Sequence, residues 1–180
     1  MNLSSAIKSP WPLGILITSL LCPLGFADQE AELGKDEVFV DFRAWVDAYL
    51  AADEDARGGM VAEGRRLAET RRLRLAKLME KKPHDAVDLM MPAAERESLP
   101  ASVREEIERP LKGEGILRAV ISDDFERGAS RTDYTLYFEG RRYHAFLSLK
   151  KNRVLLNRPL CLKGFILGGR ALLTELTPVS

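Results

Sequence analysis

The sequence is poor in the residues that build disulfides and metal centres. Its 180 residues include two cysteines, Cys22 and Cys161, and two histidines, His84 and His144. It has no His-Glu-x-x-His pair, no closely spaced cysteines and no serine within a Gly-x-Ser-x-Gly turn. These absences exclude the usual zinc and serine-hydrolase motifs, and we predict no catalytic residue, no cofactor and no metal ion.

The chain also lacks net charge. Lysine and arginine together number 27, as do aspartate and glutamate. Because proteins that bind nucleic acid usually carry a clear excess of positive charge, we expect no nucleic acid partner. The charges are unevenly spread, however: residues 28–110 hold 14 basic and 20 acidic groups, and residues 111–180 hold 12 basic and 7 acidic groups. Either the two halves attract each other within one fold, or the second half meets an acidic partner.

The longest apolar stretch lies near the N-terminus, at residues 11–26. It follows the basic residue Lys8 and ends on small residues just before Asp28, which is typical of a signal peptide. Prolines and glycines interrupt it, and it is shorter than the roughly 20 apolar residues of a spanning helix. We therefore predict that residues 1–27 are removed, that the protein is periplasmic or secreted, and that no membrane span remains.

The two cysteines have different predicted fates. Cleavage removes Cys22; the alternative, a lipoprotein anchored through Cys22, is less favoured because Leu21 replaces the usual small residue before the cysteine. Cys161 then has no partner for a disulfide. Because it lies in the apolar segment Leu160-Cys161-Leu162, we expect it to be buried as a small hydrophobe, with a functional thiol as the alternative.

Residues 28–180 are predicted to form one domain whose first half, residues 36–110, is helical. Apolar and aromatic side chains recur at helical spacing in residues 39–52, and a longer helix is predicted over residues 56–82. Prolines then separate three short helices, predicted at 84–91, 93–99 and 101–109.

Arg71 falls within the apolar stripe of the longer predicted helix, close to Leu67 and Leu75. Either its guanidinium extends outward along its own aliphatic stem, or it pairs with a carboxylate from another element. We therefore mark Arg71 as a candidate for a buried ion pair.

The second half, residues 111–176, is predicted to contain five to six short strands. Alternating side chains on either side of Glu139-Gly140 predict one hairpin, and Gly168-Gly169 closes another. Helices followed by strands indicate an α+β fold, with about five N-terminal helices packed on a small antiparallel sheet or open barrel.

Basic side chains gather near the predicted strand connections and form a candidate anionic contact surface, as an alternative to an ordinary solvated loop. They are Arg141, Arg142, Lys150, Lys151, Arg153 and Arg158. Two weaker groupings also stand out. His84 and Asp88 share one helix face but are too few for a metal site, and His144 has only the loop acids Asp123 and Asp124 as candidate partners.

Several segments together resemble the N-terminal region of large exported bacterial proteins that carry zinc-metallopeptidase or adhesion-type regions downstream. These segments are FRAWVDAYLAA, EGRRLAETRRLRLAKLME, LPASVRE, FEGRRYHAFL and GFILGGRALL, within residues 39–176. The resemblance implies a non-catalytic, pro-domain-like module with no catalytic residue to transfer. In that family the chain continues beyond the position of Ser180, so we expect that the module acts alone, acts in trans on a separate chain, or is a fragment of a longer chain.

The leading functional hypothesis is therefore an exported accessory module that binds another exported protein. Two alternatives come from other classes: an envelope hydrolase with a site near His144 and Asp123-Asp124, and a metalloprotease inhibitor that directs the Cys161 thiol at zinc.

Overall fold

The computed structural model describes residues 36–124, 129–149 and 156–179, and the side chains of residues 122–124 and 129–131 are left out of the description. The predicted signal peptide, with Cys22, lies outside these ranges. No helix in the described part has both the length and the apolar character that a membrane crossing needs.

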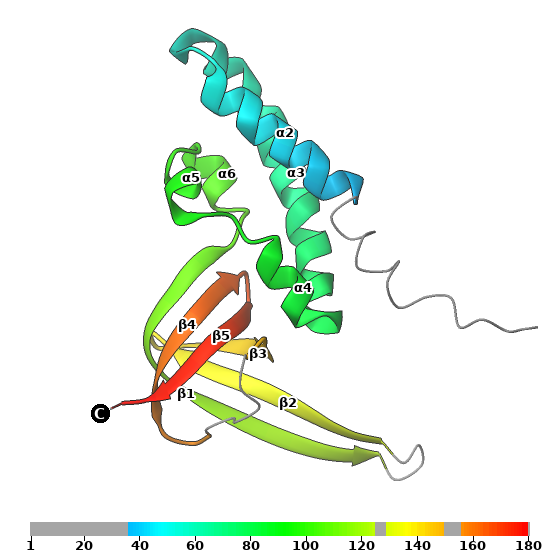
Figure 1. Ribbon diagram of the computed structural model, residues 1–180, viewed down its shortest axis with the longest axis vertical. Coiled ribbons are helices and arrows are strands. Elements are labelled where there is room, and N and C mark those ends of the chain that lie inside the picture. Colours follow the sequence, from blue (N-terminus) through cyan, green and yellow to red (C-terminus); the bar gives the residue numbers. More distant parts are fainter. Residues whose placement is uncertain (1–35, 125–128, 150–155, 180) are drawn as a thin grey trace, which may run out of the picture.

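The described chain folds as a helical layer on one end of a small β-barrel (Figure 1). The predicted α+β class with a small barrel is confirmed. The helices are α2 (Glu37–Ala51), α3 (Glu54–Lys81), α4 (Pro83–Asp88), α5 (Ala93–Glu97) and α6 (Ala101–Arg104). The strands are β1 (Arg109–Asp124), β2 (Ala129–Phe138), β3 (Arg141–Leu147), β4 (Pro159–Leu167) and β5 (Arg170–Pro178).

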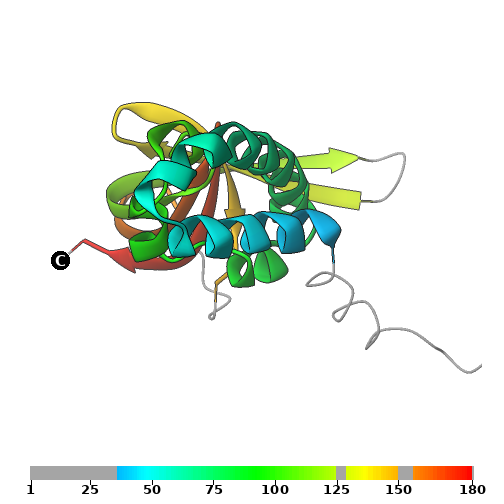
Figure 2. The same cartoon turned by 90° about the horizontal axis from the view of Figure 1, so that it is seen from above.

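Helices α2 and α3 form an antiparallel pair above the barrel, side by side in Figure 2. The side chains of Asp36 and Asp53 cap them by accepting hydrogen bonds from Val38 and Ala56 backbone N–H groups. Gly64 lets the two helices approach, because a Cβ at that position would lie 2.0 Å from the Trp45 ring.

Three apolar clusters hold the fold together. One fills the barrel, one lies among the helices, and the third joins the two layers. In the third cluster Phe39, Leu75 and Met79 of the helices pack against Leu167 and Leu172 of the barrel. Since this joint is buried and apolar, it fixes the helical layer on the barrel as one unit.

The strands close into a barrel in the order β1-β2-β3-β5-β4, with β4 paired again to β1. All neighbouring pairs are antiparallel except β3 and β5, which run parallel. The prediction of a purely antiparallel sheet or an open barrel is therefore wrong. A five-stranded Greek-key barrel of this kind has the architecture of OB-type barrels.

The two predicted hairpin turns are both present. Phe138 pairs with Arg141 around Glu139 and Gly140, whose φ angles of 50° and 70° are those of a type I′ turn. Leu167 pairs with Arg170 around Gly168 and Gly169.

The boundary between helix and strand differs from the prediction. The helix expected at residues 101–109 ends at Arg104, and β1 already begins at Arg109. Strand β1 is long because its first part pairs with β4 and its later part with β2. At the crossover, a Cβ on Gly115 would lie 2.6 Å from the Leu162 side chain and 2.7 Å from the Tyr137 carbonyl oxygen, so glycine allows the close approach.

Candidate functional site

The candidate site lies on the outside of the barrel, over β1, β2, β3 and the start of β5. We call it the outer barrel face, and its members are Arg118, Tyr137, Arg142, His144, Phe146 and Arg170. Side chains alternate along a strand, so burying Leu117, Leu136, Tyr143 and Ala145 inside the barrel directs their neighbours outward. The face is thus produced by the same pattern that fills the core.

The strand register brings these residues together from distant parts of the chain. Arg118 is paired with Thr135, Thr135 with His144, and His144 with Arg170, so one row crosses four strands. In the next row Tyr137 pairs with Arg142. Neighbouring strands lie about 4.8 Å apart, so the row from Arg118 to Arg170 spans roughly 14 Å.

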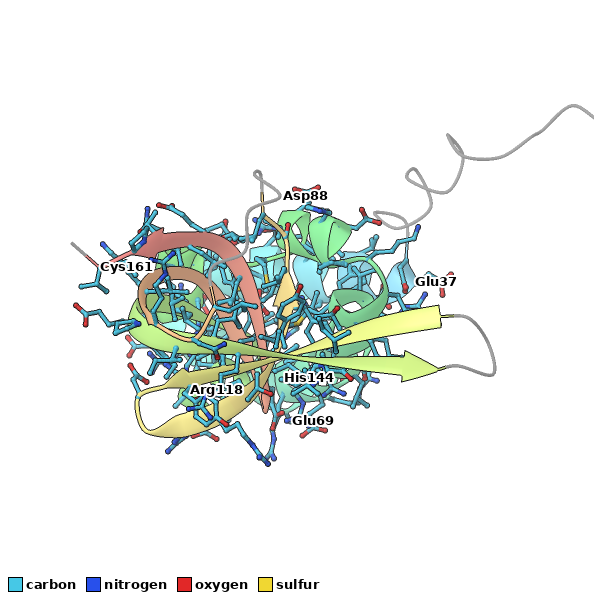
Figure 3. The ribbon with its side chains drawn as sticks, turned by 90° about the horizontal axis from the view of Figure 1, so that it is seen from below. Glu37, Glu69, Asp88, Arg118, His144 and Cys161 are labelled. Atoms are coloured by element: carbon cyan, nitrogen blue, oxygen red, sulfur yellow. The ribbon has the colours of Figure 1, made fainter. Side chains whose placement is uncertain are left out.

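Two ring contacts order the face. The Arg118 guanidinium carbon lies 5.0 Å from the centroid of the Tyr137 ring, a cation–π arrangement. The rings of His144 and Phe146 have centroids 4.8 Å apart. Figure 3 places Arg118 and His144 on this side of the barrel, with Cys161 elsewhere. The face therefore offers flat ring surfaces beside positive charge.

The arginines of the face are not neutralised by nearby acids. Arg118, Arg142 and Arg170 have no ion pair with any residue that the structure describes. The acids that border the face are Glu80, near the end of α3, and Asp133, which has an interaction of its own. The outer barrel face thus keeps a local excess of positive charge.

Two neighbouring hollows lie along the face, with volumes of about 510 and 360 Å³. Both are lined by Glu80, His144 and Phe146; Tyr134 lines the larger and Arg170 the smaller. A partner that lies across the face therefore meets a concave surface under the end of α3.

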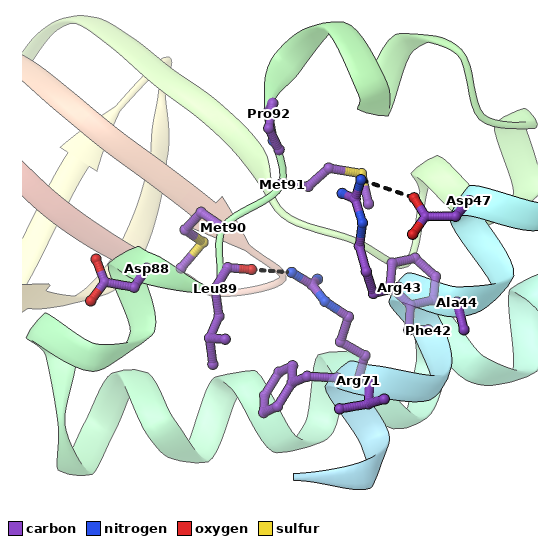
Figure 4. A pocket seen from close by; sticks show the side chains of 12 residues that line it. Phe42, Arg43, Ala44, Asp47, Arg71, Asp88, Leu89, Met90, Met91 and Pro92 are labelled. Atoms are coloured by element: carbon purple, nitrogen blue, oxygen red, sulfur yellow. Dashed lines mark hydrogen bonds and ion pairs between the residues drawn. The ribbon is translucent and has the colours of Figure 1, made fainter. Parts of the chain in front are cut away.

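Arg71 forms a buried ion pair with Glu108, the residue just before β1. Of the two predicted alternatives, an outward-pointing guanidinium and an ion pair with another element, the structure shows the ion pair. The Arg71 Nη1 atom lies 2.5 Å from Glu108 Oε2, and Nη2 lies 3.0 Å from Oε1. The two residues are 3% and 0% exposed. The guanidinium also donates to the Leu89 carbonyl oxygen at 2.6 Å, as Figure 4 shows, and the Met91 N–H donates to Glu108 at 2.6 Å.

Arg71 lines an open hollow between α2 and the chain that links α4 to α5 (Figure 4). The aromatic rings of Phe39 and Phe42 cover the guanidinium, with centroids 6.0 and 5.3 Å from its carbon. Because α3, the linker and the start of β1 all meet at Arg71 and Glu108, the pair is a structural junction of the two layers.

The Arg71–Glu108 ion pair makes the stability of the fold depend on pH. Burial raises the pKa of Glu108, but hydrogen bonds and charge from Arg71, with the Met91 N–H, outweigh it and hold the pKa below the usual value of about 4.5. The pair therefore contributes its full stabilisation above that value and loses it as the pH falls through the lowered pKa.

We expect the unfolding free energy of the wild type to fall more steeply below about pH 4.5 than that of Arg71→Met/Glu108→Leu. Urea unfolding at a series of pH values measures both slopes, and equal slopes would contradict the assignment.

The predicted basic surface is only partly described. Arg141, Arg142 and Arg158 are exposed, while Lys150, Lys151 and Arg153 lie outside the described ranges. Arg158 comes just before Pro159, and the paired positions Pro159, Ile116, Tyr137 and Arg142 form one row across β4, β1, β2 and β3. Arg158 and Arg142 are thus at opposite ends of a row about 14 Å wide.

Cys161 is exposed on β4, so the prediction of a buried side chain is wrong. Leu160 and Leu162 point into the barrel, and strict alternation leaves Cys161 on the outside. It lies opposite Glu114 and Thr177.

The histidines are not brought together. His84, in α4, has its Nδ1 atom 2.8 Å from the Ser148 Oγ atom and so ties α4 to the end of β3. His144 is level with Arg118, whereas Asp123 comes five residues further along β1, roughly 17 Å away at strand spacing. The described residues contain no group of three His, Cys, Asp or Glu side chains suited to a metal ion.

Most of the outer barrel face was not marked from the sequence. Arg142 belonged to the predicted basic surface and His144 to a weak grouping with Asp123 and Asp124, but Arg118, Tyr137, Phe146 and Arg170 were missed. The alternation of side chains along each strand was the available signal, because it predicts which residues point outward. It does not predict which strands lie next to each other.

We compared the chain with family models, curated proteins and solved structures. No family model, no curated protein and no solved structure matches the chain.

Proposed function

We propose that this protein is an exported, non-catalytic accessory module, pro-domain-like in character, that binds another exported protein through its outer barrel face. The observation that supports this most is the group of three arginines that have no ion pair with any described residue and lie beside the rings of Tyr137, His144 and Phe146. Arginine and aromatic side chains are the types enriched at the energetic centres of protein interfaces. Export is supported by the signal-peptide pattern of residues 1–27.

The architecture supports the choice of this face. In OB-type barrels the face of the second and third strands recurrently binds oligonucleotides and oligosaccharides, so this part of the barrel is a recurrent binding surface. Such a fold hosts many functions, so the proposal depends on the side chains found there and not on the barrel alone. A rigid barrel also presents the side chains with little ordering cost on binding.

The experiment uses the full chain, produced in a bacterial host with a C-terminal tag. We expect an intact mass that begins at Asp28, and co-purification from the cell envelope of a protein that is itself exported. The same interaction should form again from the two purified proteins. An intact N-terminus or a lipid on Cys22 would contradict the export route, and recovery of no exported partner would contradict the binding function.

A further inference from the structure

We infer that the outer barrel face recognises an extended acidic polypeptide segment, one that carries several carboxylates together with apolar side chains. This inference rests on the proposed function and names the chemistry of its partner.

The charge of the face selects an acidic ligand. Its three arginines have no ion pair within the described residues, although nine other arginines of the described chain do. Bare guanidinium groups on a shared surface repel one another, and a carboxylate ligand relieves that repulsion with bidentate hydrogen bonds. The rest of the β half adds to the positive field, since residues 111–180 hold 12 basic and 7 acidic groups.

The spacing of the arginines selects an extended ligand. Arg118 and Arg170 end a four-strand row roughly 14 Å wide, and Arg142 lies two residues away along β3, roughly 7 Å from the row. One small anion does not reach all three groups. An extended chain repeats on one side every two residues, about 7 Å, so acids at alternate positions match these distances.

The exposed apolar side chains on and beside the outer barrel face favour a polypeptide over other polyanions. Val120 is 61% exposed, two residues beyond Arg118 in β1, and Tyr137 is 39% exposed. Phe146 lines both hollows. A uronic acid polymer or a nucleic acid backbone supplies the negative charge but no aliphatic side chain to cover Val120. An acidic polypeptide supplies both.

The test is fluorescence anisotropy with the purified full chain and a labelled synthetic peptide in which glutamate alternates with leucine and serine. We expect saturable binding that weakens with added salt. Arg142→Glu/Arg170→Glu should bind at least about tenfold more weakly, because it reverses two contacts. The matched control, Arg66→Glu/Lys112→Glu, makes the same change in net charge at exposed positions away from the face and should bind nearly as the wild type does.

Three results would overturn the inference: no binding of the glutamate peptide, equal loss in both double variants, or stronger binding of polygalacturonate or single-stranded DNA than of the peptide. Circular dichroism of each variant checks that the fold is intact. If the glutamate peptide fails but an exported partner still co-purifies, only the acidic-segment inference is wrong. If no partner co-purifies, the proposed function is wrong whatever the peptide does.

Discussion

Arg71→Met is expected to lower the free energy of unfolding by about 3–5 kcal/mol, the usual cost of removing one partner from a buried ion pair. Methionine fills much of the space of the arginine stem but leaves the Glu108 carboxylate, 0% exposed, without its counter-charge. It also leaves the Leu89 carbonyl oxygen without its donor. The loss is large because the junction joins α3 to the first strand of the barrel.

Urea unfolding at neutral pH measures this loss, and two further variants serve as comparisons. Arg65→Met removes the pair of the 57% exposed Arg65 with Glu69, which is 44% exposed, and a longer contact of 3.9 Å with Glu106. It should change stability by at most about 1 kcal/mol. Arg71→Met/Glu108→Leu removes both buried charges and should recover part of the loss. If Arg71→Met cost no more than Arg65→Met, the pair would not be the junction that we describe.

Gly164→Ala should destabilise the barrel by about 1–3 kcal/mol, the usual cost of overpacking. A Cβ at this position would lie 2.0 Å from the Leu172 carbonyl oxygen, and a backbone atom has little freedom to move aside. The register of β4 against β5 shifts between Lys163 and Gly164, so this close approach lies at the irregularity of the strand pair. Loss of this approach weakens the pairing that closes the barrel.

Gly169→Ala is the control for this prediction because it lies in the turn of the same hairpin with nothing within 4 Å of the added Cβ. Thermal unfolding should show a lower midpoint for Gly164→Ala and little change for Gly169→Ala. Equal midpoints would mean that the β4–β5 contact tolerates a side chain.

Local features of the fold were predictable, whereas its long-range pairing was not. Glycine-containing turns predicted both hairpins, because a tight turn requires backbone conformations that favour particular residues at the turn itself. The parallel pairing of β3 with β5 has no such local mark, since β4 comes between them in the sequence. The early start of β1 was hidden because the short helix ending at Arg104 passes into the strand without a glycine or proline break before Pro110.

The same limit applied to individual residues. Arg71, charged within an apolar stripe, indicated a buried partner, but only the three-dimensional arrangement names Glu108, 37 residues later. For Cys161 the apolar neighbours suggested burial, and alternation along the strand decided otherwise. The outer barrel face draws on four strands, so its arginines and rings become one surface only when the barrel closes.

The central claim is that the outer barrel face holds an exported partner, and quantitative co-purification from the cell envelope tests it most directly. Full-length wild type, Arg142→Glu/Arg170→Glu and the control Arg66→Glu/Lys112→Glu are compared as baits at equal amounts, with isotope-labelled mass spectrometry as the readout. The account predicts one exported protein that is recovered with the wild type and the control but lost with Arg142→Glu/Arg170→Glu. Equal recovery with all three baits would contradict it.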